Sequence, residues 1–272
     1  IFDPQVLLKD FDQLGLPTED QRRWHTMVRQ TSGIILVTGP TGSGKTSTLY
    51  TTLKQLATRE VNLCTVEDPI EMVEPAFNQM QVQSNIDLTF ASGIRALLRQ
   101  DPDIIMIGEI RDRETAEMAI QAALTGHLVL STLHTNDAPS AISRLQELGI
   151  AHYLIKATLI GVMAQRLVRL LCPHCKRVAD ERYEAVGCAQ CRDSGYRGRA
   201  GVYEIMVMDE TLKALITPGA DVQALRRAAL KQGMCSLRIA GLRKVNAGLT
   251  TLAEVLRVTP GDSDTNPLLV EP

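Results

Sequence analysis

The chain has 272 residues, of which 44% are hydrophobic and 22% charged, as in folded globular proteins and unlike disordered ones. Its 29 Lys and Arg and 31 Asp and Glu residues give a net charge of −2, which argues against an extended nucleic-acid-binding surface. The sequence has no apolar run near the roughly 18 residues of a membrane helix, and no leader of the secretory type opens it. The length predicts two domains. Because the first residue is Ile1 and not Met, we expect an N-terminal part to precede it.

Apolar runs alternate with helical patterns through the first half of the chain. Buried strands are predicted at residues 33–38, 61–66, 103–107 and 127–133, and helices at 20–30, 46–57, 90–99 and 114–124. This alternation predicts an α/β fold with a parallel sheet. From Ser140 to Val258 the pattern favours helices, interrupted by a cysteine-rich segment, and residues 260–272 predict a disordered tail.

The most specific motif follows the first predicted strand. Residues 39–46, GPTGSGKT, match the GxxxxGK[ST] phosphate loop, and they lie between a strand and a helix as that motif requires. A chance glycine turn is the alternative. In a phosphate loop Lys45 reaches the β- and γ-phosphates, and the Thr46 hydroxyl binds Mg²⁺. The predicted nucleotide-binding residues are Gly39, Pro40, Thr41, Gly42, Ser43, Gly44, Lys45, Thr46 and Ser47.

Two carboxylates follow predicted strands and so belong at the ligand-binding edge of an open α/β sheet. Glu109 comes after the third strand, where Gly108 replaces the usual Asp, and we expect it to act on magnesium through water. Glu67 ends the second strand and is a candidate for polarising the attacking water. A solvated strand-end Glu is the alternative for Glu109, and capping of the next turn is the alternative for Glu67 or Glu71.

His127 and His134 flank the fourth predicted strand and so belong at opposite ends of it. One histidine alone is most often a hydrogen-bonded core or edge residue. Near a phosphate loop, however, His134 is placed to sense the γ-phosphate by donating a hydrogen bond. The pattern leaves both readings open.

Four of the six cysteines form two CxxC pairs, Cys172/Cys175 and Cys188/Cys191. Two such pairs bring four thiolates to one point, which is the pattern of a structural zinc site. Cys64 and Cys235 stand alone in apolar surroundings and are predicted to be buried hydrophobic residues.

Four ordered segments together resemble those of the secretion ATPases that power type II secretion and type IV pilus assembly. They are the phosphate loop, residues 65–71 (similar to that family's aspartate box), residues 98–112 (similar to its Walker B region, including Gly108) and residues 125–135 (similar to its histidine box). The resemblance covers residues 34–258. It implies a RecA-like P-loop NTPase core, a homo-hexameric ring, and ATP hydrolysis that rotates subunits beneath a platform protein of the bacterial inner membrane.

The resemblance also implies roles for single residues. Glu67 matches the catalytic carboxylate, Glu109 the Walker B acid and His134 a sensor of the nucleotide state. Arg95, Arg99 and Arg111 match arginines near subunit interfaces, where a guanidinium stabilises charge on the transferred phosphate. A solvated helix face is the alternative for two of these arginines.

The resemblance suggests a domain plan and a location. We expect a linker and entry helix (1–32), a RecA-like ATPase core (33–165), a tetracysteine zinc module (166–199), a C-terminal helical subdomain (200–259) and the tail. The four cysteines favour an assembly motor over a retraction motor, because the retraction relatives lack the insertion. The protein is expected in the cytoplasm, peripheral to the inner membrane, with ATP, Mg²⁺ and Zn²⁺ as its cofactors. Residues 166–199 contain eight Arg or Lys and four Asp or Glu, so this segment either touches the platform protein or acidic lipid, or is a plain solvated surface.

Two other functions remain in competition. One is a nucleic-acid-dependent RecA-like ATPase with zinc knuckles, which the net charge of −2 and an aromatic content of 4% disfavour. The other is a scaffold that binds nucleotide without turnover, which intact Lys45, Glu67 and Glu109 disfavour. We therefore expect no nucleic-acid partner.

Overall fold

The computed structural model describes residues 11–179 and 182–261. The strands are β1 (Gly33–Thr38), β2 (Leu63–Glu67), β3 (Asn78–Gln81), β4 (Ile104–Ile107), β5 (Leu128–Leu133), β6 (Leu159–Leu171), β7 (Arg177–Ala179), β8 (Arg182–Glu184) and β9 (Tyr196–Val207). The α-helices are α1 (Thr18–Val28), α2 (Lys45–Leu56), α3 (Phe90–Leu97), α4 (Arg113–Leu124), α5 (Ser140–Glu147), α6 (His152–Thr158), α7 (Glu210–Leu215), α8 (Val222–Lys231), α9 (Leu237–Asn246) and α10 (Leu252–Val258).

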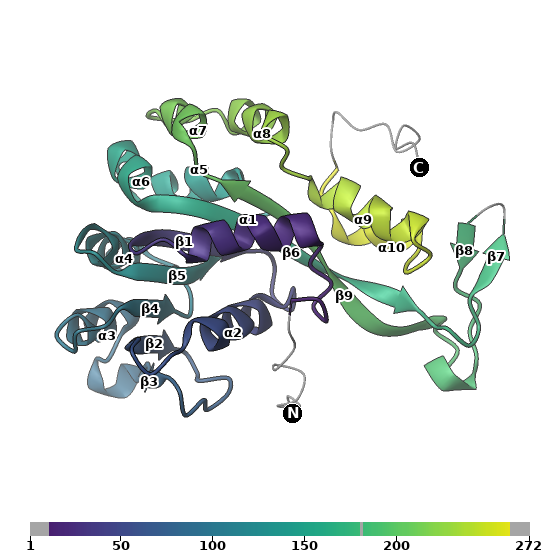
Figure 1. Ribbon diagram of the computed structural model, residues 1–272, viewed down its shortest axis with the longest axis horizontal. Coiled ribbons are helices and arrows are strands. Elements are labelled where there is room, and N and C mark those ends of the chain that lie inside the picture. The colour runs from purple at the N-terminus through teal and green to yellow at the C-terminus, as the bar shows by residue number, and fades with distance from the viewer. Residues whose placement is uncertain (1–10, 180–181, 262–272) are drawn as a thin grey trace.

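One seven-stranded sheet organises the molecule, in the order β3-β2-β4-β5-β1-β6-β9 (Figure 1). The pairs from β3 to β6 are parallel, and only β9 runs antiparallel to its neighbour. All residues of β1, β2, β4 and β5 are buried. Such strands need helices on both faces, and this explains their continuous apolar runs.

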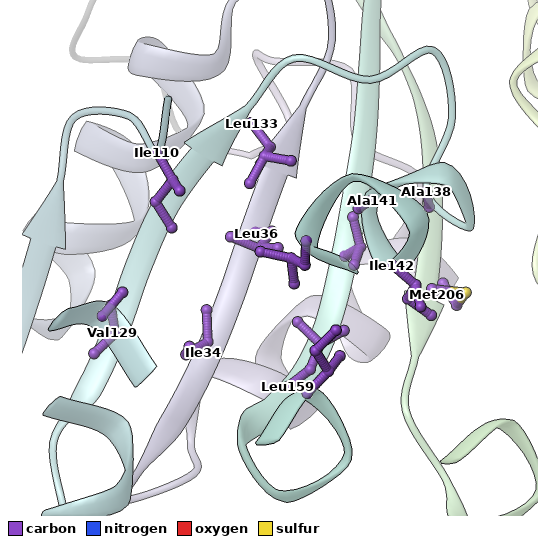
Figure 2. Close-up of a cluster of buried hydrophobic side chains, with 14 of the residues drawn as sticks. Ile34, Leu36, Ile110, Val129, Leu133, Ala138, Ala141, Ile142, Leu159 and Met206 are labelled. Carbon is purple, nitrogen blue, oxygen red and sulfur yellow. The ribbon is translucent and has the colours of Figure 1, made fainter. Parts of the chain in front are cut away.

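The two faces of the sheet carry separate apolar layers. On one face, Trp24 of α1 and Leu49 of α2 pack against Ile35 and Val37 of β1. On the other face the helices from α3 onward cover the sheet. Figure 2 shows part of that second layer, where Leu36 of β1 and side chains of β5, β6 and β9 meet Ala141 and Ile142 of α5.

The eight elements predicted in the first half of the chain are confirmed, with bounds shifted by a few residues. The prediction of helices from Ser140 onward is wrong in two places, because Leu159–Leu171 and Tyr196–Val207 are the long strands β6 and β9. β6 is buried over most of its length and β9 over residues 201–206, on both faces of the sheet, so neither strand has the alternating pattern that would have marked it. The predicted tail at 260–272 lies almost wholly outside the described residues, as do residues 1–10 of the predicted linker.

Residues 172–195, here called the four-cysteine arm, connect the outer ends of β6 and β9 and include β7 and β8. Figure 1 shows the arm at the end of the molecule farthest from the parallel strands β2, β3 and β4. Its base is attached to the turn between α9 and α10. There Lys176 Nζ donates to Gly248 O at 3.1 Å, and the Tyr183 ring lies against Gly248.

Among the described residues, no helix combines the length and the apolar character needed to span a membrane.

Candidate nucleotide and metal sites

Four sequence motifs meet at one edge of the sheet. The strands β1, β2, β4 and β5 are parallel, so their carboxyl ends share an edge, where open α/β sheets bind ligands. The phosphate loop follows β1, Glu67 is the last residue of β2, Glu109 follows β4 and His134 follows β5. Thr38 at the end of β1 ties two of these segments together, since the Thr135 N–H donates to its Oγ1 at 2.8 Å.

The phosphate loop closes on its own lysine. Lys45 Nζ donates to the carbonyl oxygens of Gly39 at 2.9 Å and Pro40 at 3.1 Å. Lys45 is buried, and this burial lowers the pKa of its ammonium, while the nearby Glu109 carboxylate acts in the opposite direction. The ammonium therefore has two neutral acceptors that the oxygens of a phosphate can replace.

The glycines of the loop permit close packing behind it. A Cβ on Gly39 would lie 2.5 Å from the carbonyl oxygen of Gln165, and one on Gly44 would lie 2.8 Å from Gln165 Nε2. Gly44 also has φ of 87°, a left-handed conformation that glycine adopts without strain, and α2 begins at the next residue. The Ser43 hydroxyl is buried without a hydrogen-bond partner among the described residues. The Ser43 hydroxyl, unpaired in the described part of the chain, and the glycines, which have no side chains, leave this loop suited to binding a phosphate group.

Glu109, Arg111 and His134 form a cluster at the same edge. Arg111 Nη2 donates to Glu109 Oε1, and His134 Nε2 lies 3.6 Å from Glu109 Oε2. The Glu109 side chain is 14% exposed, whereas that of His134 is 49% exposed and faces solvent at the edge. The structure thus brings together three residues that the sequence predicted separately. His127 is at the far end of β5, where its Nδ1 lies 2.9 Å from Ala122 O.

Glu67 is buried and held by three donors. Tyr50 Oη donates to Glu67 Oε2 at 2.6 Å, Thr65 Oγ1 to Oε1 at 2.7 Å and Gln79 Nε2 to Oε1 at 3.1 Å. These hydrogen bonds fix the orientation of the Glu67 carboxylate. The Glu67 hydrogen bond and burial both raise the pKa of Tyr50, burial more strongly. Glu67 is therefore an oriented carboxylate rather than a cap of the following turn, and Glu71 is exposed.

Arg95 and Arg99 do not join the cluster around Glu109. Both are exposed on or just after α3, where Arg95 lies 3.7 Å from Glu114 and Arg99 Nη1 donates to Arg95 O. Since α3 begins beside Gly108 and leads back toward the start of β4, Arg99 lies toward the opposite edge of the sheet. Within one chain these two arginines remain separate from the phosphate loop.

The four predicted metal ligands come together in the four-cysteine arm. Their sulfur atoms all lie within 4.8 Å of one another. The Sγ atoms of Cys172 and Cys188 are 3.9 Å apart, and those of Cys175 and Cys191 are 3.8 Å apart. Tetrahedral zinc with bonds of about 2.3 Å requires sulfurs about 3.8 Å apart, so the donor set fits zinc. The N–H groups of Cys188 and Gly195 donate to Cys191 Sγ at 3.2 Å, which stabilises a thiolate. Outside this cluster, Cys64 is buried as predicted, and Cys235 is half-buried against the core.

Sequence reasoning missed the residues that support the site from a distance. Tyr50 and Gln79 orient Glu67, and Gln165 accepts a 2.7 Å hydrogen bond from Thr48 beneath the phosphate loop. Gln165 and its neighbour Arg166 lie within the strand β6, at the predicted boundary between the ATPase core and the tetracysteine module. Their partners are 30 to more than 100 positions away, and no local pattern marks such contacts.

A glycine-rich loop between a central parallel strand and a helix, with carboxylates at the ends of other strands on the same edge of the sheet, defines a P-loop nucleotide-binding protein. The comparisons with known proteins narrow this class. The model of the type II/IV secretion system protein family matches residues 1–257, and the chain belongs to that family.

Curated relatives come from both branches of the family. The chain is 58% identical over 279 aligned positions to the type IV pilus assembly ATPase TfpB of Acinetobacter baylyi, covering 96% of this chain and 48% of that protein. It is 54% identical to the type II secretion system protein HxcR of Pseudomonas aeruginosa, covering 95% of this chain and 55% of the relative. The chain thus spans about half the length of these relatives.

Solved structures share the fold. The pilus retraction motor PilT with bound ADP superposes with a TM-score of 0.75 at 29% identity, covering 95% of this chain and 69% of that one. The ATPase DotB of Legionella pneumophila gives a TM-score of 0.73 at 26% identity, covering 92% of this chain and 65% of that one. The predicted α/β fold with a P-loop core, a four-cysteine cluster and C-terminal helices is therefore confirmed.

Proposed function

We propose that this chain is the motor portion of an ATPase that drives type IV pilus assembly or type II secretion. The observation that carries the proposal is the convergence of the phosphate loop, Glu67, Glu109 and His134 at one edge of the sheet. The relatives named above supply the biological process, and their division between pilus assembly and type II secretion leaves both open for this chain.

The phosphate loop binds ATP. Main-chain N–H groups of residues 41–47 surround the phosphates, and Lys45 leaves the carbonyls of Gly39 and Pro40 to reach the β- and γ-phosphates. Thr46 holds Mg²⁺ together with the nucleotide. Glu109 supports that ion through water, because Gly108 occupies the position of the usual direct ligand.

Glu67 polarises the attacking water, and His134 senses the γ-phosphate. The hydrogen bonds from Tyr50 and Gln79 hold the Glu67 carboxylate in one orientation before substrate binds. His134 lies beside Glu109 and is half exposed, so it can donate to a phosphate oxygen above the loop. Arg111 contributes positive charge next to Glu109.

Completion of the site requires a second subunit. Arg95 and Arg99 are exposed, and their contacts are with Glu114 and the Arg95 carbonyl rather than with the phosphate loop, so they serve a neighbouring copy in a homo-hexameric ring. The ring lies at the cytoplasmic face of the inner membrane, attached through a platform protein. The four cysteines hold Zn²⁺, which fixes the fold of the four-cysteine arm and takes no part in hydrolysis.

Two variants test the proposal with different expected signatures. Lys45→Ala removes the cation that meets the β- and γ-phosphates, so we expect nucleotide affinity to fall at least tenfold and turnover to be lost. Glu109→Gln keeps the size of the side chain and removes its charge, so we expect ATP to bind with affinity near that of the wild type and to remain unhydrolysed, with turnover reduced about 100-fold or more. Titration with a fluorescent ATP analogue and phosphate release measure the two effects.

Wild-type turnover in both variants would contradict the proposal. Tight nucleotide binding without phosphate release, in the wild-type full-length protein as well as in the variants, would identify a nucleotide-binding scaffold instead. Turnover that rises on addition of single-stranded DNA or RNA would revive the nucleic-acid-dependent alternative.

A further inference from the structure

Arg166 of β6 connects three parts of the molecule behind the phosphate loop. Its Nη2 donates to Asn136 O at 2.7 Å, in the segment that follows His134. Its Nε donates to Val258 O at 3.2 Å, at the end of α10, and its Nη1 donates to Gln165 O at 3.0 Å. One guanidinium thus joins the main chain of the His134 segment to that of the last helix.

The charge of this guanidinium is not neutralised by direct contact. Arg166 is 5% exposed, and in the described part of the chain none of its hydrogen bonds goes to a carboxylate. Glu204 and Asp137 act electrostatically on Arg166 without a hydrogen bond to it, and both have other partners. Asp137 binds Arg226 at 2.6 Å, and Glu204 accepts from the N–H groups of Ala138 and Leu237. Burial lowers the pKa of Arg166 more than these two carboxylates raise it, so a bound anion would stabilise the guanidinium cation.

The phosphate loop lies within that field. A Cβ on Gly39 would lie 3.1 Å from Arg166 Nη1, so the guanidinium packs directly against the first glycine of the loop. The positive charge of Arg166 also acts on Lys45, lowering the pKa of its ammonium in addition to the larger effect of burial. Two cations that repel each other across a loop are both stabilised when a polyphosphate binds there.

We propose that Arg166 is a positioning residue of the nucleotide site: its buried charge strengthens phosphate binding, and its forked hydrogen bonds hold the His134 segment against the end of α10. The inference rests on the proposed nucleotide site. It gives the protein a physical link from the phosphates to the C-terminal helices, because any shift of Asn136 displaces the same side chain that holds Val258.

Two substitutions distinguish the effect of the positive charge of Arg166 from the effect of its forked hydrogen bonds. Arg166→Met removes both, so we expect the affinity for a fluorescent ADP analogue to fall about tenfold. Arg166→Lys keeps the charge but lacks the planar fork, so it cannot bridge Asn136 O and Val258 O. In Arg166→Lys we expect affinity within about threefold of the wild type, with kcat for ATP about tenfold lower. If Arg166 had only a structural role, its substitutions would change ADP affinity and kcat together.

Arg238 provides the matched control. Its Nη2 donates to the carbonyls of Thr259 and Pro260, so it holds the same C-terminal segment without touching the phosphate loop. Arg238→Met and Arg238→Lys are expected to leave ADP affinity within twofold of the wild type. Equal loss of affinity in Arg238→Met and Arg166→Met would overturn the inference. Wild-type kcat in Arg166→Lys, which retains the positive charge, would overturn it as well. A wild-type chain that binds no ADP at all would instead overturn the proposed nucleotide site.

Discussion

The ligand edge of the sheet and the four-cysteine arm are built on different principles. At the edge, β1, β2, β4 and β5 are buried throughout and covered by helices on both faces, so packing alone fixes the positions of the loops that follow them. In the arm, the buried residues among those described are only Cys172, Cys191 and Gly195. A segment with so little apolar burial cannot offset its loss of chain entropy without a further constraint.

Substitutions in these two regions should therefore have different effects. Substitutions at the ligand edge should alter chemistry while the fold persists, because the core supports the backbone independently of the site. Substitutions among the four cysteines should remove the fold of the arm while the chemistry at the edge persists. The arm contacts the rest of the molecule through the turn at Gly248 and through β6 and β9, not through the phosphate loop.

The largest effect is expected from loss of a metal ligand. Cys188→Ser should reduce bound zinc from about one ion per chain to near zero and unfold the arm, since structural zinc sites supply the folding energy of small modules. Elemental analysis and proteolysis within residues 172–195 measure the two consequences. Cys235→Ser, outside the cluster, should keep the metal. A metal-free wild-type chain with a protected arm would contradict the comparison.

A smaller effect, on turnover alone, is expected from Tyr50→Phe. This substitution removes the 2.6 Å hydrogen bond that orients Glu67, so kcat should fall about tenfold while nucleotide affinity is unchanged. Tyr203→Phe is the control, because the Tyr203 hydroxyl donates to Leu14 O in the same apolar layer. Each variant should lose about 1 kcal/mol of stability. If both variants lowered kcat equally, the orienting role of Tyr50 would be refuted.

Arg99→Ala tests whether one chain alone forms the complete catalytic site at the ligand edge of the sheet. If Arg99 serves a neighbouring copy, turnover per wild-type full-length chain should rise with protein concentration, and the variant should lower the plateau about fivefold without changing affinity. Arg59, another exposed arginine, gives the control Arg59→Ala, which should behave as the wild type. Turnover that is independent of concentration in a monomeric full-length protein would exclude the ring.

The smallest effect is a change in the pH dependence of stability. Burial raises the pKa of Glu204 to about 7, so the folded chain binds a proton more tightly than the unfolded chain does. The contribution of Glu204 to the free energy of unfolding should therefore fall as pH rises from about 4.5 to about 7. Urea unfolding at pH 5 and pH 7.5 should show this decline in the wild type and a weaker one in Glu204→Gln.

Glu254→Gln controls for the loss of a buried carboxylate. Burial opposes ionisation of Glu254, but hydrogen bonds from Arg257 and Arg169 lower its pKa to about 2, below the tested range. Glu254→Gln should therefore keep the wild-type difference between pH 5 and pH 7.5. An undiminished difference in Glu204→Gln would show that another group titrates.

Much of the ligand edge could be predicted from the sequence, because its motifs are local. The phosphate loop, the strand that precedes it and the helix that follows occupy consecutive residues, and the acids mark strand ends. The strand β6 could not be predicted, because most of its 13 residues are buried on both faces of the sheet and polar residues such as Gln165 and Arg166 are buried among them, so no alternating pattern separates strand from helix. The contacts of Arg166 with Asn136 and Val258 depend on that strand, so they too required the structure.

Hydrogen exchange of the intact, zinc-loaded chain, recorded with and without MgADP and before and after chelation, tests whether the ligand edge and the four-cysteine arm are independent. We expect MgADP to slow exchange in residues 39–47 and in the segments that follow Glu109 and His134. Chelation should accelerate exchange in residues 172–195 and leave the nucleotide-dependent protection intact. Loss of protection at the phosphate loop on chelation, or no protection by MgADP there before it, would contradict the account.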